Sequence, residues 1–349
     1  MTTEQPVFVD VGHPGAYAMI CGGLSVLERT IRLAGKAGAT RAIVPAAPIP
    51  LRADLPVAVE WVAEGTAAPI ALRADLPVTV EWVAEGTAAP EGAKVVRADE
   101  VAGVPIRDAA SLRKAEKALV AGLGKSHEGP VDQYFNSHFS RPITTALMRT
   151  RITPNHITLF ATLVGLTGAI WLLGGTWQAF AIGGTLLEIQ CILDSCDGEI
   201  ARLKYQGSKL GQWLDTITDG ILDNAFVACI SIAVGGIWGT IGLALVIARI
   251  YVEIYVYVDV YKRTGTPDQT LFRLWYEDEK ATADEIYDRS SFNSHFRSLG
   301  RRDVFVAAYW IFCLVNLPEG VILYASVMNG ISFVGIAADH LVKTFRRKK

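Results

Sequence analysis

The chain has 349 residues, enough for two domains, and 51% of them are hydrophobic, with a positive mean hydropathy of +0.29. The apolar excess lies in long runs at 156–262 and 303–343, a distribution that argues against a soluble protein. A net charge of −2 gives no indication of nucleic-acid binding, and the five cysteines lack paired or zinc-ligand spacing, so we expect reduced packing residues.

Residues 1–110 are predicted to form a small cytosolic α/β domain, and their start lacks the basic and apolar regions of a signal peptide. Residues 24–38 have helical periodicity and are followed by a β-rich run at 41–46. A tandem duplication comes next: residues 51–69 and 72–90 differ at one position. Each copy contains one predicted strand, and the second strand either pairs at a sheet edge or loops out.

Residues 111–155 are predicted to form a linker and an amphipathic helix. Apolar residues recur every four positions from Val131 to Leu147, polar residues lie between them, and Pro142 predicts a kink. We expect this helix to lie on the cytosolic membrane surface. The alternative is a soluble helix that packs on the N-terminal domain.

Six apolar segments predict an α-helical polytopic membrane domain over 156–343, although the fifth segment is short. They are residues 156–174, 177–200, 212–235, 237–260, 303–317 and 319–342. Alternate connections contain nearly all the lysine and arginine, which places these loops and both termini in the cytosol, in the cell inner membrane. The polar segment 264–302 is expected to be a solvated connection or a cytosolic lid.

Four aspartates are spaced so that their carboxylates can meet near the cytosolic ends of two helices. Asp194 and Asp197 are three residues apart on one helix, and Asp215 and Asp219 are four apart on the next. An aspartate costs about 2.5–3.5 kcal/mol at the bilayer centre, so four of them require positive partners. Oxygen ligands favour hard divalent cations, and two such ions are a recurrent device for phosphoryl transfer. The alternative is a polar stripe that joins the helices.

These residues form the pattern D-x-x-D-G-x-x-A-R-x8-G-x3-D-x3-D, which resembles the signature of the CDP-alcohol phosphotransferase family at every fixed position. The resemblance covers about 130–343, including the run Thr153-Pro154-Asn155. It implies transfer of a phosphoalcohol group from a CDP-alcohol to an alcohol or polyol-phosphate acceptor, release of CMP, and a homodimer in the bilayer. It implies two Mg²⁺ or Mn²⁺ ions on Asp194, Asp197, Asp215 and Asp219, with Asp219 as general base. It also implies a CDP-binding surface made of Gly198, Ala201, Arg202, Gly211 and Asn155.

The flanking sequences DGEIARLK and DQYFNSHFSRPIT are similar to the branch that contains di-myo-inositol-phosphate-phosphate synthase, where a cytidylyltransferase domain is often fused in front. Residues 22–44 resemble an early helix–strand segment of such nucleotidyltransferases. The stretch 11–23 lacks the arginine and the spacing of their nucleotide-binding loop, and the domain is too short. We therefore expect a reduced domain with a structural or regulatory role.

An acceptor phosphate requires basic residues near the cytosolic face, and Arg249 and Lys209 are the candidates. Arg249 lies within the fourth segment, where charged residues are usually functional or paired, and Glu253 one turn later is the alternative explanation. Lys209, like Arg301 and Arg302, is otherwise a topology determinant. Two other functions stay open: a divalent-metal-binding membrane transporter, and a transferase whose N-terminal domain is a non-catalytic partner-binding module.

Overall fold

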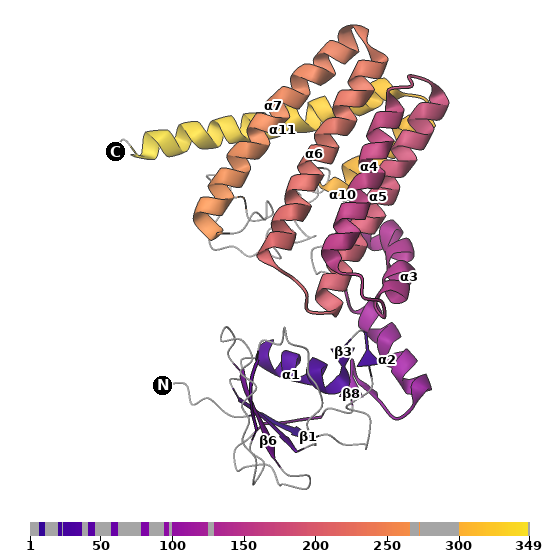
Figure 1. The fold of residues 1–349 in the computed structure, drawn as a ribbon. Coiled ribbons are helices and arrows are strands. Elements are labelled where there is room, and N and C mark those ends of the chain that lie inside the picture. Colours follow the sequence, from indigo (N-terminus) through magenta and orange to yellow (C-terminus); the bar gives the residue numbers. More distant parts are fainter. Residues whose placement is uncertain are drawn as a thin grey trace. The chain divides into compact units, whose positions relative to one another are not determined.

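The computed structural model divides the chain into two compact units, residues 1–122 with 148–150, and residues 123–147 with 151–349 (Figure 1). The residues that it describes are 7–10, 20–22, 24–36, 41–45, 57–61, 78–83, 94–97, 100–124, 129–265, 272 and 300–347. The predicted nucleotide-binding stretch at 11–23 and the polar connection at 264–302 lie largely outside these residues.

The first unit contains a parallel five-stranded sheet, as expected of an α/β unit. In sheet order, the strands are β5 (Val57–Trp61), β6 (Val78–Val83), β4 (Arg41–Pro45), β1 (Val7–Asp10) and β7 (Lys94–Arg97). Helix α1 (Val26–Lys36) precedes β4, which agrees with the predicted helix–strand order.

Both copies of the duplication form strands, and these strands are neighbours. β5 from the first copy lies at the sheet edge, and β6 from the second copy lies between β5 and β4. Equivalent positions of the two copies pair, from Val57 with Val78 to Trp61 with Trp82. The strand of the second copy therefore does not loop out, and the repeat adds one strand to the sheet.

Helix α2 (Ala109–Ala121) completes the core of the first unit, which also contains two short hairpins. The hairpin strands are β2 (Ile20–Cys21), β3 (Leu24–Ser25), β8 (Glu100–Val101) and β9 (Val104–Pro105). Asp108 starts α2 by accepting a 2.7 Å hydrogen bond from the amide of Ser111. Burial of Cys21 raises the pKa of its thiol to about 11, and all five cysteines are free, as expected of packing residues.

The second unit is helical, and within its described residues five helices are long and apolar enough to cross a membrane. They are α4 (Pro154–Leu172), α5 (Trp177–Leu203), α6 (Lys209–Val234), α7 (Gly236–Thr264) and α11 (Pro318–Arg347). The fifth predicted segment forms α10 (Arg302–Leu314), whose 13 residues extend about 20 Å, too short to span a bilayer. This helix ends before Asn316, which has a φ of 57°, and Pro318 then begins α11. Among the described helices, five of the six expected segments therefore have the length and hydropathy of a membrane span, and a sixth span is not confirmed.

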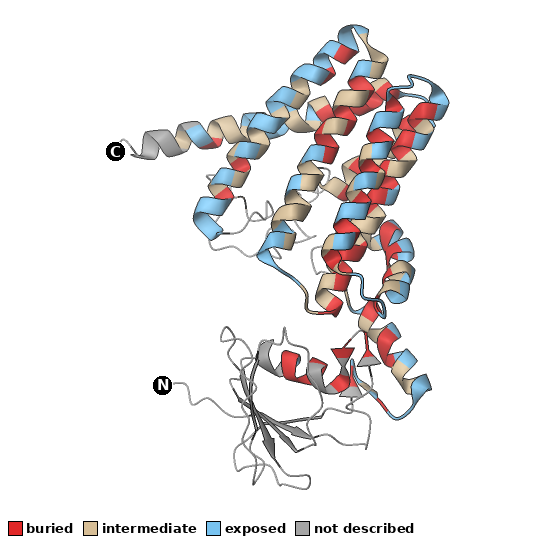
Figure 2. Ribbon diagram, viewed as in Figure 1, coloured by how far each residue is buried: buried red, intermediate tan, exposed pale blue. Residues whose placement is uncertain are grey.

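Close helix packing positions the motif helices. Gly168 on α4 and Gly183 on α5 are so close that a Cβ on either would lie 2.8 Å from the other's carbonyl oxygen. Phe226 of α6 stacks on Tyr309 of α10 at 6.0 Å in the buried core. Large apolar side chains such as Ile247 face outward, and Figure 2 shows the alternation of buried and exposed positions along these helices. This pattern fits a lipid surrounding.

The predicted amphipathic helix consists of one π-helical turn (Asp132–Asn136) followed by α3 (Ser137–Leu147), and Pro142 lies inside α3. Its orientation is unusual because the buried face is polar and the apolar face is exposed. Buried positions are Asn136, Ser137, Ser140 and Thr144, whereas Tyr134, Phe135 and Phe139 are exposed. Packing against α5 covers the polar face, and the membrane-surface position of this helix stays a prediction.

Candidate active site

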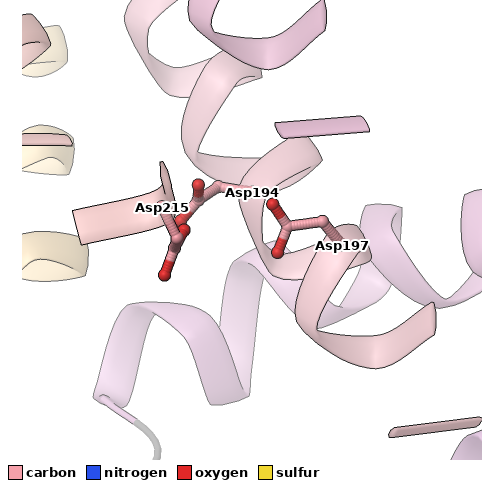
Figure 3. A group of neighbouring side chains, drawn as sticks. All are labelled: Asp194, Asp197 and Asp215. Carbon is pink, nitrogen blue, oxygen red and sulfur yellow. The ribbon is translucent and has the colours of Figure 1, made fainter. Parts of the chain in front are cut away.

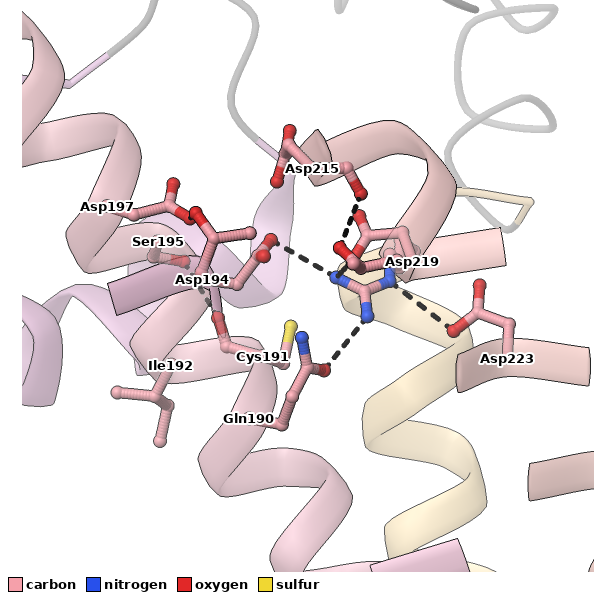
Figure 4. A network of polar contacts seen from close by, with 12 residues as sticks. Gln190, Cys191, Ile192, Asp194, Ser195, Asp197, Asp215, Asp219 and Asp223 are labelled. Atoms are coloured by element: carbon pink, nitrogen blue, oxygen red, sulfur yellow. Dashed lines mark hydrogen bonds and ion pairs between the residues drawn. The ribbon is translucent and has the colours of Figure 1, made fainter. Parts of the chain in front are cut away.

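Three of the four predicted aspartates converge between α5 and α6. Asp194 and Asp197 lie on α5, Asp215 lies on α6, and each offers a carboxylate oxygen within 4.8 Å of those of the other two (Figure 3). Asp219 follows one turn later on α6 and faces the same group of residues (Figure 4). The i, i+3 and i, i+4 spacings therefore place the carboxylates on facing sides of two adjacent helices, as predicted.

Hydrogen bonds hold both ends of the connection between α5 and α6. Lys204, which is buried, donates from Nζ to the carbonyl oxygen of Ile152 at 3.0 Å and to that of Leu147 at 3.4 Å. Ser208 caps α6, and its Oγ accepts from the Gly211 amide at 3.0 Å. These bonds fix where α6 begins, and therefore which side of the helix carries Asp215 and Asp219.

Two residues predicted to bind CDP are brought together at this end of the helices. A Cβ on Gly211 would lie 3.0 Å from the side-chain oxygen of Asn155, so a larger residue there would push the Asn155 side chain away. A Cβ on Gly198 would lie 3.3 Å from Nη1 of Arg202, so these two residues are also neighbours. Ala201 is partly exposed in the last turns of α5.

Thr158 and Glu199 support the site, although neither was predicted. The Thr158 hydroxyl on α4 donates a hydrogen bond to Oδ2 of Asp197, and both residues are buried. Glu199 accepts from Ser140 at 2.8 Å and from Thr144 at 2.5 Å, which fastens α3 to α5 beside the motif. The sequence pointed to the start of α4 through the run Thr153-Pro154-Asn155, and Thr158, which contacts Asp197, lies one turn later on that helix.

Arg302, predicted only as a topology determinant, lies among the carboxylates. Its Nη1 is 2.8 Å from Oδ1 of Asp219 and 3.1 Å from Oδ2 of Asp194. Its Nη2 donates to Oε1 of Gln190 at 2.9 Å, and its Nε lies 3.4 Å from Oδ1 of Asp223. The interpretation as a topology determinant alone is therefore wrong, because the first residue of α10 supplies a cation to the aspartates of α5 and α6.

Arg249 has the acidic partners that the alternative explanation required. Its Nε lies 2.7 Å from Oε1 of Glu253, and its Nη2 lies 2.9 Å from Oδ2 of Asp223. Asp223 is four residues beyond Asp219, so the row of aspartates on this face of α6 extends one helical turn past the motif. Lys209, the other candidate for an acceptor phosphate, is exposed at the first position of α6.

The charges of the site fit divalent cations. The four motif aspartates carry a formal charge of −4 when ionised, and Arg302, which contacts Asp194 and Asp219, offsets one of these charges. The remaining negative charge is one that divalent cations would neutralise. Carboxylate oxygens are the ligands that Mg²⁺ and Mn²⁺ prefer, so the donor set matches such ions.

Comparison with known proteins identifies the family of this chain. A family model described as CDP-alcohol phosphatidyltransferase matches residues 151–331, just over half of the chain. The bifunctional IPC transferase and DIPP synthase of Archaeoglobus fulgidus is 34% identical over 122 residues, which are 35% of this chain and 24% of that protein. The phosphatidylinositol phosphate synthase of Mycobacteroides abscessus is 31% identical over 122 residues, 34% of this chain and 54% of that protein. The chain thus spans between a quarter and about half of the length of these relatives.

Among solved structures, the phosphatidylinositol phosphate synthase of Mycobacterium tuberculosis with CDP-DAG bound aligns with a TM-score of 0.42 at 18% identity. That alignment covers 58% of this chain and 93% of the other. The match of the family model to residues 151–331 includes the whole aspartate motif and five of the membrane-domain helices. By its sequence, this chain belongs to the CDP-alcohol phosphatidyltransferase family.

Proposed function

We propose that this chain transfers a phosphoalcohol group from a CDP-alcohol to an acceptor alcohol and releases CMP. The observation that carries the proposal is the convergence of Asp194, Asp197 and Asp215, whose oxygens lie within 4.8 Å of one another on two membrane helices. Membership of the CDP-alcohol phosphatidyltransferase family supports the same reaction. A partly buried acidic group of this kind can hold divalent cations, which a reaction on a diphosphate requires.

Two divalent ions, Mg²⁺ or Mn²⁺, are part of the proposal. Asp194, Asp197 and Asp215 would hold them, together with Asp219. Such ions, when bound, neutralise the diphosphate and the departing phosphate. Thr158 supports this role because its hydroxyl orients the carboxylate of Asp197.

The protein residues have distinct tasks in the proposed reaction. Asp219 takes the proton from the acceptor hydroxyl, and the acceptor oxygen then bonds to the β-phosphorus of the donor. The bond between that phosphorus and the bridging oxygen breaks, and CMP leaves with the electron pair. Arg302 stabilises the negative carboxylate of Asp219 at 2.8 Å. The donor's CDP is held on the surface made of Asn155, Gly198, Ala201, Arg202 and Gly211.

Inositol-phosphate-like alcohols are the substrates that we propose. The relatives are described as IPC transferase and DIPP synthase or as phosphatidylinositol phosphate synthase, which supports an inositol group in the donor or the acceptor. Lys209 and Arg249 are the proposed contacts of an acceptor phosphate. Lys209 is the first choice, because Arg249 is already paired with Asp223 and Glu253.

We also propose the placement of the molecule. The basic connections put both termini, the first unit and the active site on the cytosolic side of the cell inner membrane, with the protein acting as a homodimer. The first unit would have a structural or regulatory role. An active site at the cytosolic face lets a soluble alcohol reach a lipid partner.

Release of CMP tests the proposed reaction. Purified protein in detergent with Mg²⁺ or Mn²⁺ would receive CDP-diacylglycerol or CDP-inositol, each with inositol, inositol phosphate or glycerol phosphate. We expect CMP from wild-type protein with metal and none from Asp219→Asn. Asp259→Asn is the matched control. It also changes an ion-paired aspartate to asparagine, but Asp259 lies on α7 and pairs with Arg263. Failure of every pair to yield CMP would contradict the proposed function.

A further inference from the structure

Asp223 joins the active-site carboxylates to two arginine side chains, although it lies outside the motif. Its side chain is only 6% exposed. Oδ2 accepts from Nη2 of Arg249 at 2.9 Å, and Oδ1 lies 3.4 Å from Nε of Arg302. Because the two arginines come from α7 and α10, one carboxylate on α6 connects three helices.

The contacts of Arg302 show what this connection does. Its three guanidinium nitrogens face different acceptors: Nη1 faces Asp194 and Asp219, Nη2 faces Gln190, and Nε faces Asp223. A planar guanidinium that is anchored through Nε and Nη2 has a fixed direction for Nη1. Asp223 and Gln190 therefore hold the group in the orientation that directs Nη1 at the two motif aspartates.

Asp223 is far from the end of α6 that carries the proposed CDP surface. It lies twelve residues after Gly211, which corresponds to about 18 Å along the helix. A change at Asp223 should therefore alter the orientation of Arg302 without removing a contact to the donor. This separation predicts an effect on turnover and little effect on donor binding.

We propose that Asp223 is a positioning residue, whose carboxylate holds the guanidinium of Arg302 against Asp194 and Asp219 during the transfer. The inference rests on the proposed function, because Arg302 can affect turnover only if these aspartates carry out the reaction. Glu253 provides a comparison within the chain: like Asp223, it pairs with Arg249, but it is on α7 and, among the described residues, it has no ion pair with Arg302.

A double-mutant cycle tests the proposal by CMP release in detergent with metal. We expect Asp223→Asn to lower kcat about ten-fold while the KM for the CDP-alcohol stays within about two-fold. Arg302→Gln should lower kcat at least as much, and the double variant should be no slower than Arg302→Gln alone. Glu253→Gln should keep kcat within about two-fold of wild type.

Three results would overturn the proposal: full turnover by Asp223→Asn, single effects that multiply in the double variant, or an equal loss in Glu253→Gln. Thermal unfolding in detergent accompanies each assay, and Asp223→Glu, which keeps the charge, should recover at least about a third of wild-type kcat. If Asp223→Asn does not fold, Asp223→Ser, which also removes the carboxylate, replaces it in the cycle. Absence of CMP from the wild-type protein would instead overturn the proposed function itself, so the two failures are distinguishable.

Discussion

The guanidinium Nη1 of Arg302 lies 2.8 Å from Oδ1 of Asp219, so the first residue of α10 contacts the last aspartate of the motif. The same nitrogen is 3.1 Å from Asp194 on α5. One cation therefore bridges the two helices that carry the motif. The short helix α10 contributes to the site through its N-terminal residue.

Arg302→Lys should reduce CMP release about ten-fold or more. A lysine keeps the charge but has one nitrogen, so it cannot contact Asp194, Asp219, Gln190 and Asp223 together. The neighbouring Arg301→Lys is the control, because Arg301 pairs with Asp303 at 3.5 Å. Steady-state kinetics of the two variants checks the expectation, and equal rates would show that only a basic residue near the membrane surface is needed.

Thr158→Val should raise the metal concentration that gives half-maximal CMP release, by about ten-fold. Valine has nearly the shape of threonine, but it removes the hydroxyl that donates to Asp197, so the carboxylate loses the group that orients it. Thr167→Val on the same helix is the matched control, since the Thr167 hydroxyl is exposed and donates to the carbonyl of Leu163 at 2.8 Å. An unchanged Mg²⁺ or Mn²⁺ titration for Thr158→Val would argue against Asp197 as a ligand.

The site shows which relationships a sequence can predict. Asp194 and Asp197, and likewise Asp215 and Asp219, are on one helix each, so spacing alone indicates a shared face. Arg302 and Thr158 reach the site from other helices, and no local period relates them to the motif. Their contacts depend on how α4 and α10 pack against α5.

In the fold, too, some features follow from the local sequence and others depend on tertiary contacts. The apolar runs located the long helices because a hydrocarbon layer requires about 20 apolar residues. The end of α10 is set by the backbone at Asn316, whose φ of 57° no hydropathy pattern reveals. For the duplication, one strand was predicted in each copy, but their order in the sheet depends on β4, which pairs with β6 and not with β5.

Thr144→Val should destabilise the second unit by about 1–3 kcal/mol. Thr144 is fully buried and donates to Oε2 of Glu199, so the variant leaves a buried carboxylate oxygen without this donor. Thr145→Val is the control, because its hydroxyl is exposed and donates to the carbonyl of Arg141. Thermal unfolding in detergent should give a lower midpoint for Thr144→Val alone. Equal midpoints would mean that α3 does not depend on Glu199 for its attachment.

Deletion of residues 51–71 should leave a folded first unit and unchanged CMP release. The deletion joins Pro50 to Leu72. Because both copies begin with the same residues, the sequence that follows Pro50 is nearly unchanged. The remaining strand keeps its partner β4, and only the edge strand β5 is lost. Limited proteolysis and the CMP assay check this expectation. Rapid cleavage of the shortened unit would show that the first copy has become essential to the sheet.

A pair of proline variants separates the two copies by their place in the sheet. Val59 in β5 and Val80 in β6 are equivalent positions of the repeat and pair with each other, but Val80 also pairs with Ala42 of β4. Proline removes a backbone donor and is tolerated mainly in edge strands. We therefore expect Val80→Pro to lower the unfolding midpoint of the first unit and to speed its proteolysis, whereas Val59→Pro stays close to wild type. Equal sensitivity at both positions would contradict the order β5-β6-β4, because the surrounding sequences of the two copies are nearly identical and only their neighbours in the sheet differ.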